Sequence, residues 1–228
     1  YNNIGYAKMN QAKVSEAIEN YNTSIDFYVK SGDSASLATK LNNIALIHFN
    51  QGNIAKSLAL FQTSLSISEK YNDQSAIAQA YNNIGVSHQK LGDTATAIKY
   101  LTLSLKMREL MGDKRGMLTN LNNIGTLYKS QKKIDEARNY YNRSLRISIE
   151  LGDKKGQALV YNNIAVICRN KDQADSALYY YNKALELRIA VNDRAGIANS
   201  HANISKAYVA MWRQLKLTQS AAMRIAEK

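Results

Sequence analysis

The chain has 228 residues, 45% of them hydrophobic, and it contains no proline. This hydrophobic content is enough for a buried core and excludes an intrinsically disordered chain, while the lack of proline suits long uninterrupted helices. The single cysteine, Cys168, excludes an internal disulfide and leaves the redox compartment open, and no apolar stretch reaches the ~18 residues of a membrane span.

The net charge of +12 is spread unevenly along the chain. Residues 1–80 carry six basic and six acidic residues, residues 81–160 carry fourteen and seven, and residues 161–228 carry ten and five. The last two thirds are therefore expected to present a basic surface. Such a surface favours acidic partners, although the same charge also serves solubility.

A five-residue sequence returns six times at a spacing of 40 residues. It reads YNNIG from Tyr1, LNNIA from Leu41, YNNIG from Tyr81, LNNIG from Leu121, YNNIA from Tyr161 and HANIS from His201. A fixed period in this range is typical of a solenoid. The sequence predicts a single stack over residues 1–228, with repeats near 1–33, 34–73, 74–113, 114–153, 154–193 and 194–228. Because the chain begins inside a repeat and without methionine, we expect it to be a fragment of a longer chain.

Each repeat contains two segments with helical periodicity, which we call helix A and helix B. In residues 74–113, Tyr81, Ile84 and His88 share one face of helix A, and Ala97 and Leu101 share one face of helix B. Helices A are expected near 34–50, 75–90, 115–130, 155–170 and 195–210. Helices B are expected near 14–31, 54–71, 94–111, 134–151 and 174–191. Residues 1–12 are predicted to be part of a helix A, and residues 213–227 a last helix B.

A dipeptide of Gly or Asn followed by Asp marks the end of five repeats. The pairs are Gly32-Asp33, Asn72-Asp73, Gly112-Asp113, Gly152-Asp153 and Asn192-Asp193. Gly and Asn tolerate the left-handed backbone conformation that ends a helix, and Asp accepts hydrogen bonds from the free N–H groups of the next helix. These pairs therefore predict where each helix B ends and the next helix A begins.

Small residues recur at one position of each helix, where a larger side chain would force the two helices apart. They are Gly5, Ala45, Gly85, Gly125, Ala165 and Ser205 in helices A, and Ala17, Ser57, Ala97, Ala137 and Ala177 in helices B. With Ile84, Leu101 and Ser104 in other packing positions, the pattern resembles the tetratricopeptide repeat (TPR) along the whole chain. The repeat is longer than usual and lacks the family's closing proline, and it looks like the long-repeat arrays of kinesin light chains and bacterial signalling proteins. The resemblance implies an all-α solenoid of antiparallel helix pairs, a right-handed superhelix of about 5.5 repeats with helices A lining a concave groove.

The second asparagine of each repeated motif is expected on the groove side of helix A. These residues are Asn43, Asn83, Asn123, Asn163 and Asn203. Each offers one carbonyl and one amide group, and neighbouring helices lie ~10 Å apart, which is about three residues of extended peptide. A ladder of asparagines could therefore hold a peptide backbone. The alternative is that one asparagine of each pair bonds to the next repeat and only stiffens the stack.

Four cations are expected on the same side of helices A, without Asp or Glu at the matching positions: Lys90, Lys129, Arg169 and Lys206. They favour an acidic peptide segment or a carboxylate terminus as ligand, although a solvated basic face would look the same. Near the N-terminal end, Phe49 and Leu46 predict an apolar patch that could anchor a side chain. Equally, these two residues could pack beneath a preceding segment.

No catalytic, cofactor or metal motif stands out. His48, His88 and Cys168 share one repeat position that faces the core, so we expect them to fill it rather than bind metal. These residues predict a non-catalytic scaffold that binds a protein or peptide segment, and the resemblance to the long-repeat arrays implies that it is the sensory or docking region of a bacterial signalling protein. The alternative is a nucleic-acid-binding or regulatory module that uses the basic last two thirds. The compartment, cytoplasmic or periplasmic, and the oligomeric state stay open.

Overall fold

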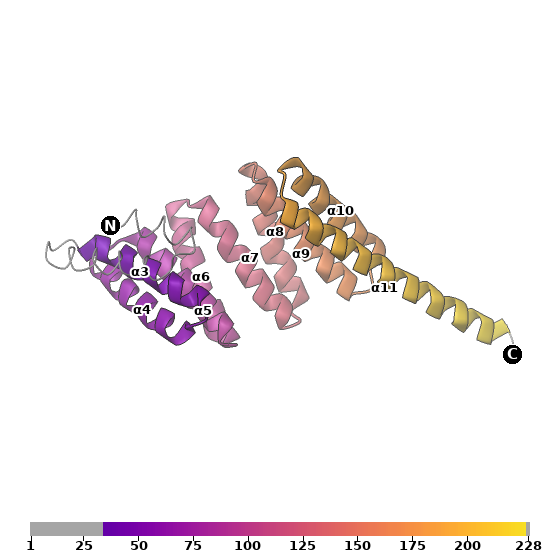
Figure 1. The fold of residues 1–228 in the computed structure, drawn as a ribbon, viewed down its shortest axis with the longest axis horizontal. Helices are drawn as coiled ribbons and strands as arrows, with labels where there is room; N and C mark the ends of the chain where they lie inside the picture. The colour runs from indigo at the N-terminus through magenta and orange to yellow at the C-terminus, as the bar shows by residue number, and fades with distance from the viewer. Residues whose placement is uncertain (1–33, 227–228) are drawn as a thin grey trace. The chain divides into compact units, whose positions relative to one another are not determined.

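The computed structural model describes residues 34–226, which form helices joined by short turns (Figure 1). The helices are α3 (Ser34–Asn50), α4 (Ile54–Lys70), α5 (Gln74–Lys90), α6 (Thr94–Met111), α7 (Lys114–Ser130), α8 (Ile134–Glu150), α9 (Lys154–Asn170), α10 (Ala174–Ala190) and α11 (Arg194–Ala226). No strand occurs within this range, so the all-α class is confirmed. The predicted helices over residues 1–12 and 14–31 and the cap at Gly32-Asp33 lie outside the described residues.

The chain divides into two compact units, residues 1–120 and 121–228, and each is described by itself. In the first unit α3 packs on α4, α4 on α5 and α5 on α6. In the second unit α8 packs on α9, α9 on α10 and α10 on α11. Helices A of adjacent repeats also touch, α3 with α5 and α9 with α11. This packing in a row is that of an α-solenoid, whereas one continuous stack over the whole chain stays a prediction.

The turns that follow helices B are those that the Gly/Asn-Asp pairs predict. Asn72, Gly112, Gly152 and Asn192 have φ angles of 53°, 67°, 63° and 56°. The Asp that follows each of them accepts a hydrogen bond from the third residue after it. These bonds join Ala76 N to Asp73 Oδ1 (3.0 Å), Gly116 N to Asp113 Oδ1 (2.9 Å), Gly156 N to Asp153 Oδ1 (2.9 Å) and Gly196 N to Asp193 Oδ1 (3.0 Å). Both parts of the prediction are confirmed within the described residues.

The expected break between residues 210 and 213 is wrong. The structure has one uninterrupted helix, α11, over residues that the sequence pattern divided into a helix A and a last helix B. In the earlier repeats the turn between A and B contains a residue with positive φ, at Gly52, Gly92, Lys132 and Asp172. The residue 40 positions after Asp172 is Trp212, and a bulky residue pays a steric penalty in that conformation, so the helix continues.

The recurring small residues allow close approach of the two helices of a hairpin, as expected. A Cβ atom on Gly85 would lie 2.8 Å from Leu101 Cγ, and one on Gly125 would lie 2.8 Å from Tyr141 Cε1. Ala165 is fully buried in a cluster that also contains Tyr141. No helix in the described part of the chain combines the length and apolar character needed to cross a bilayer.

The residues of the shared histidine position fill space between helices. His48 and Cys168 are buried, at 7% and 1% exposure, which confirms the interpretation as core residues. His88 is half-buried and stacks on Tyr100, with ring centroids 6.0 Å apart. Within residues 34–226, no group of three or more His, Cys, Asp or Glu side chains is placed to hold a metal ion.

Acidification is expected to weaken the fold through His48. Burial, and then the positive charge of Lys56, lower the pKa of His48 below its ordinary value of 6.5. His48 therefore binds a proton more readily in the unfolded chain than in the folded chain. The stabilisation that neutral His48 provides is fully present above pH 6.5 and is lost as the pH falls below 6.5. Urea unfolding at pH 7.5, 6.5 and 5.5 should show a decline that is smaller in His48→Tyr, which copies Tyr128 at the same repeat position. An equal decline in both proteins would contradict this assignment.

Candidate functional site

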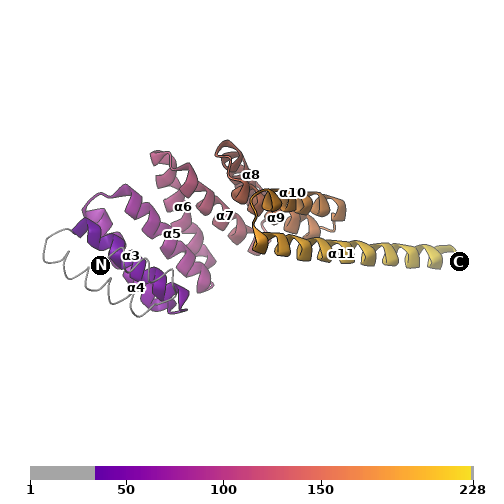
Figure 2. The same ribbon diagram turned by 45° about the horizontal axis from the view of Figure 1, so that its top comes forward.

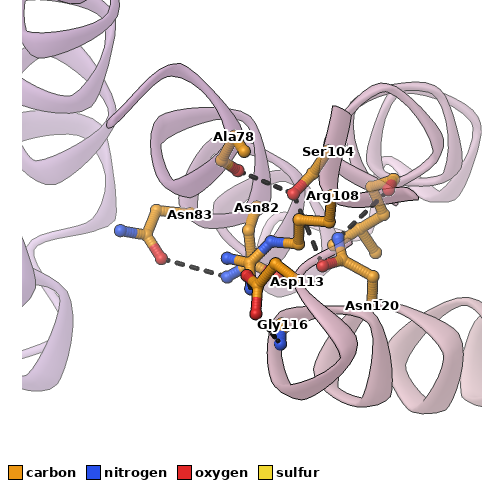
Figure 3. Close-up of polar contacts among 9 residues, drawn as sticks. Ala78, Asn82, Asn83, Ser104, Arg108, Asp113, Gly116 and Asn120 are labelled. Carbon is orange, nitrogen blue, oxygen red and sulfur yellow. Dashed lines mark hydrogen bonds and ion pairs between the residues drawn. The ribbon is translucent and has the colours of Figure 1, made fainter. Parts of the chain in front are cut away.

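Asparagines of adjacent helices A form hydrogen-bonded rungs. In the first unit Asn83 Nδ2 on α5 donates to Asn42 Oδ1 on α3 at 2.8 Å. Asn82 Nδ2 donates to Asn83 Oδ1 at 3.1 Å, which fixes the orientation of the Asn83 amide (Figure 3). In the second unit the same rung joins Asn203 Nδ2 on α11 to Asn162 Oδ1 on α9 at 2.9 Å. The bracing role that the sequence left open is therefore present at two places.

Bracing does not use all of the hydrogen-bonding groups of these side chains. An Asn amide has two N–H donors and an oxygen with two lone pairs. The bond to Asn42 uses one N–H donor of Asn83, and the bond from Asn82 uses one lone pair of the Asn83 oxygen. One donor and one lone pair of Asn83 remain, on a half-buried side chain. Asn43, Asn123, Asn163 and Asn203 are half-buried as well. Peptide binding by the second asparagines thus stays a prediction, with the amide orientation at Asn83 fixed in advance.

Arg169 and Lys206, which the sequence singled out separately, line one concavity in the second unit. It has a volume of about 570 Å³ and lies between the end of α9 and the middle of α11. Its other lining residues are Ser205, Val209, Ala210 and Arg213. The site therefore combines three cationic side chains with a short apolar floor made by Val209 and Ala210.

Lys129 extends this positive region on the α7 segment of the same unit. Its side chain is half-buried, and burial followed by the positive charge of Arg169 lowers the pKa of Lys129. Asp172 and Arg169 both line a second, small cavity, but no ion pair joins them. Within the described part of the chain, none of Lys129, Arg169, Lys206 and Arg213 is paired with a carboxylate. The arrangement can therefore accept an anion, whose charge would relieve the repulsion between these cations.

The sequence did not predict Arg213 at this site, because its pattern ended helix A at residue 210 and placed residue 213 at the start of a separate helix B. Since α11 continues without a break, Arg213 lies two helical turns after Lys206 and reaches the same concavity. The signal that could have identified it is the absence of Gly, Asn or Asp at position 212. In the first unit Lys90 is exposed at the end of α5 and Phe49 is half-buried near the end of α3. Their roles as groove residues stay predictions.

Stacked helix pairs, with small residues where the two helices of a pair meet, define a protein of the helical-repeat class. The family follows from the sequence: models of the tetratricopeptide repeat match residues 36–110, 76–150 and 158–188. These matches cover more than half of the chain, which therefore belongs to the tetratricopeptide repeat family. Repeats of this family generally serve as non-catalytic protein-binding scaffolds.

Several solved structures share the fold. BtubC (BKLC) from P. vanneervenii superposes with a TM-score of 0.73 at 20% identity, over 95% of this chain and 89% of that protein. A signal transduction ATPase with numerous domains and a tetratricopeptide repeat sensor, from Pyrococcus horikoshii, superposes with a TM-score of 0.82 at 17% identity. The match covers 100% of this chain and 35% of that protein. A Rap protein complexed with Competence and Sporulation Factor superposes with a TM-score of 0.61 at 15% identity, over 89% of this chain and 64% of that protein. At these identities the likeness concerns the fold alone, and a search of curated protein sequences finds no significant match.

Proposed function

We propose that this chain is a non-catalytic scaffold that binds an acidic peptide or protein segment along its helices A. The observation that carries the proposal is the shared concavity of Arg169, Lys206 and Arg213, with Lys129 beside Arg169 and no carboxylate paired with any of them. Guanidinium groups bind carboxylates in a two-pronged geometry, which suits an Asp or Glu side chain or a chain terminus. The half-buried asparagines alongside would bond to the peptide backbone.

The scaffold is proposed to act as the sensory or docking region of a bacterial signalling protein. The Pyrococcus protein carries its tetratricopeptide repeats as a sensor, and the Rap protein binds Competence and Sporulation Factor. The chain spans only about a third of the Pyrococcus protein. Any effector of the present protein is therefore proposed to lie outside these 228 residues. The repeats themselves would transmit to that effector the binding of a ligand in the concavity.

A matched pair of charge variants tests the acidic ligand. The probe is a fluorescein-labelled peptide of alternating Glu and Ala with a free carboxyl terminus, followed by anisotropy at ~150 mM salt, where long-range attraction is screened. Lys129→Gln combined with Arg169→Gln should weaken binding at least tenfold, because two desolvated charges lose their partners. Lys154→Gln combined with Lys155→Gln removes the same charge from exposed lysines at the start of α9 and should leave the affinity within about twofold.

Three results would count against the proposal. Equal weakening by both double variants would mean non-specific attraction to a basic surface. No binding of the peptide by the unchanged protein would exclude this class of ligand. Retention of a single-stranded oligonucleotide at the same salt, with loss in the Lys129/Arg169 variant, would favour the nucleic-acid alternative instead.

A further inference from the structure

The hydroxyl group of Tyr181 on α10 is buried without a hydrogen-bond partner. Tyr181 is fully buried, and its Oη has no donor or acceptor among the described residues. The side chain lies inside the second unit, where α10 packs against both α9 and α11 (Figure 2). A buried polar group that stays unpaired costs free energy, and most buried polar groups in folded proteins are paired. The Tyr181 hydroxyl is thus an unused donor in the core of this unit.

The preceding repeat shows why the hydroxyl has no partner. The equivalent residue in α8 is Tyr141, whose hydroxyl lies 3.1 Å from Thr126 Oγ1 on α7. The residue 40 positions after Thr126 is Val166, which has no polar side-chain group. Packing does not require the hydroxyl either, because two earlier repeats bury an apolar side chain at the position of Tyr181. These side chains are Phe61 in α4 and Leu101 in α6.

The repeat geometry directs the hydroxyl toward the side of α9 that carries the candidate site. Thr126 stands three residues before Lys129 and therefore shares its face of the helix. Val166 stands three residues before Arg169 in the same way, and it packs against the buried cluster that contains Tyr181. We therefore expect the Tyr181 hydroxyl to face the turn of α9 that runs from Val166 to Arg169.

The charge of Arg169 acts on this hydroxyl. Burial raises the pKa of Tyr181, and the positive charge of Arg169 opposes the rise. A guanidinium group has N–H donors and no acceptor, so Arg169 cannot accept the hydroxyl proton, and neither can the ammonium group of Lys206 nearby in the concavity. The Tyr181 proton therefore remains available to an acceptor that approaches Arg169.

Small residues of α11 line the floor next to Arg169. Ala207 belongs to the same buried cluster as Tyr181 and occupies the position of Ile167 in the preceding repeat. Together with Ala210 and Arg169 it lines the small cavity, whose volume is about 10 Å³. Ala210 and Arg169 line the concavity of the candidate site as well. A cavity of this size has room for about one small group such as an oxygen atom.

We propose that the Tyr181 hydroxyl donates a hydrogen bond to the carboxylate of the peptide bound in the concavity. This role rests on the proposed function, because it assigns a further ligand-binding residue to the same site. The carboxylate attracts the Arg169 guanidinium, whose displacement uncovers the hydroxyl. One carboxylate oxygen then accepts from Tyr181 while the other stays with Arg169. Binding thereby pairs a donor that is unpaired in the free protein, so no existing bond of that donor is lost in exchange.

Tyr181→Phe tests this role, and Tyr141→Phe is its matched control. Both changes remove one hydroxyl from a buried ring at the same repeat position. In the anisotropy titration with the Glu and Ala peptide, Tyr181→Phe should weaken binding by about tenfold, because a hydrogen bond to a charged group is lost. Tyr141→Phe should leave the affinity within about twofold, since Thr126 already holds that hydroxyl. Unchanged affinity in Tyr181→Phe would overturn the assignment.

Urea unfolding of the free protein supplies a readout that does not depend on the peptide. Tyr181→Phe should leave the midpoint unchanged or raise it, because its hydroxyl has no partner, whereas Tyr141→Phe should lower the midpoint. An equal fall in both variants would show that the Tyr181 hydroxyl is already satisfied, and would overturn the proposal.

The same titrations separate this role from the proposed function. If Lys129→Gln with Arg169→Gln weakens binding and Tyr181→Phe does not, the acidic-peptide site stands and Tyr181 has no part in it. If the unmodified protein binds no peptide, both proposals fail.

Discussion

Replacing Gly125 with leucine is expected to lower the free energy of unfolding by about 3 kcal/mol or more. A Cβ atom at this position would already lie 2.8 Å from Cε1 and 2.9 Å from Cδ1 of Tyr141. Tyr141 cannot move aside easily, since it is fully buried and its hydroxyl lies 3.1 Å from Thr126 Oγ1. The extra carbons of a leucine would therefore separate α7 from α8. Urea unfolding followed by circular dichroism measures the loss.

The matched control is Gly125→Ala. Ala165 occupies the same repeat position, and it is fully buried in the cluster that contains Tyr181, so a methyl group is accommodated there by a small shift of the ring. The gain in helix propensity on replacing Gly, about 1 kcal/mol, offsets the cost of that shift. We expect Gly125→Ala to stay within about 1 kcal/mol of the original protein. A leucine that cost no more than alanine would contradict the close-approach explanation.

Much of the fold follows from the sequence because each signal is repeated. Asn72 and Gly112 each mark a helix end, and agreement between repeats makes the helix boundaries reliable. Lys132 was missed as a turn residue, although its φ is 60°, because lysine has no local preference for that conformation and the surrounding packing imposes it. The sequence pattern also did not predict that α11 is continuous. Weak apolar spacing after Trp212 indicated the second helix of a hairpin, although no residue there favours the backbone conformation of the turn.

The candidate site was less accessible to sequence reasoning. The sequence could place Arg169 and Lys206 on one side of helices A, because helical spacing determines the face of a side chain. It could not tell whether Asn83 binds a ligand or braces α3, since this depends on rotation of the amide and on the distance to Asn42. Arg213 required knowledge of where α11 ends. Positions within one helix are thus predictable, whereas contacts between helices need coordinates.

A buried arginine in the second unit should show strong coupling to its partner. Arg188 on α10 is 9% exposed, and its Nη1 donates to Gly196 O at 2.7 Å and to Ser200 Oγ at 2.8 Å, both on α11. Hydrogen bonds to charged groups contribute about 1.5–3 kcal/mol each, and the Ser200 hydroxyl is fully buried. We therefore expect Arg188→Ser to lower the free energy of unfolding by about 2–4 kcal/mol.

The repeat one unit earlier supplies the compensating change. Ser148 and Val160 stand at the positions of Arg188 and Ser200, and both are fully buried. Arg188→Ser combined with Ser200→Val copies that pair. The double variant removes the Ser200 hydroxyl, which would otherwise be left without its hydrogen-bond donor. A double-mutant cycle should give a coupling of about 1–2 kcal/mol in favour of the double variant, since the cost of the unpaired hydroxyl is removed. If the two single losses simply add, the bond from Arg188 to Ser200 does not hold α10 to α11.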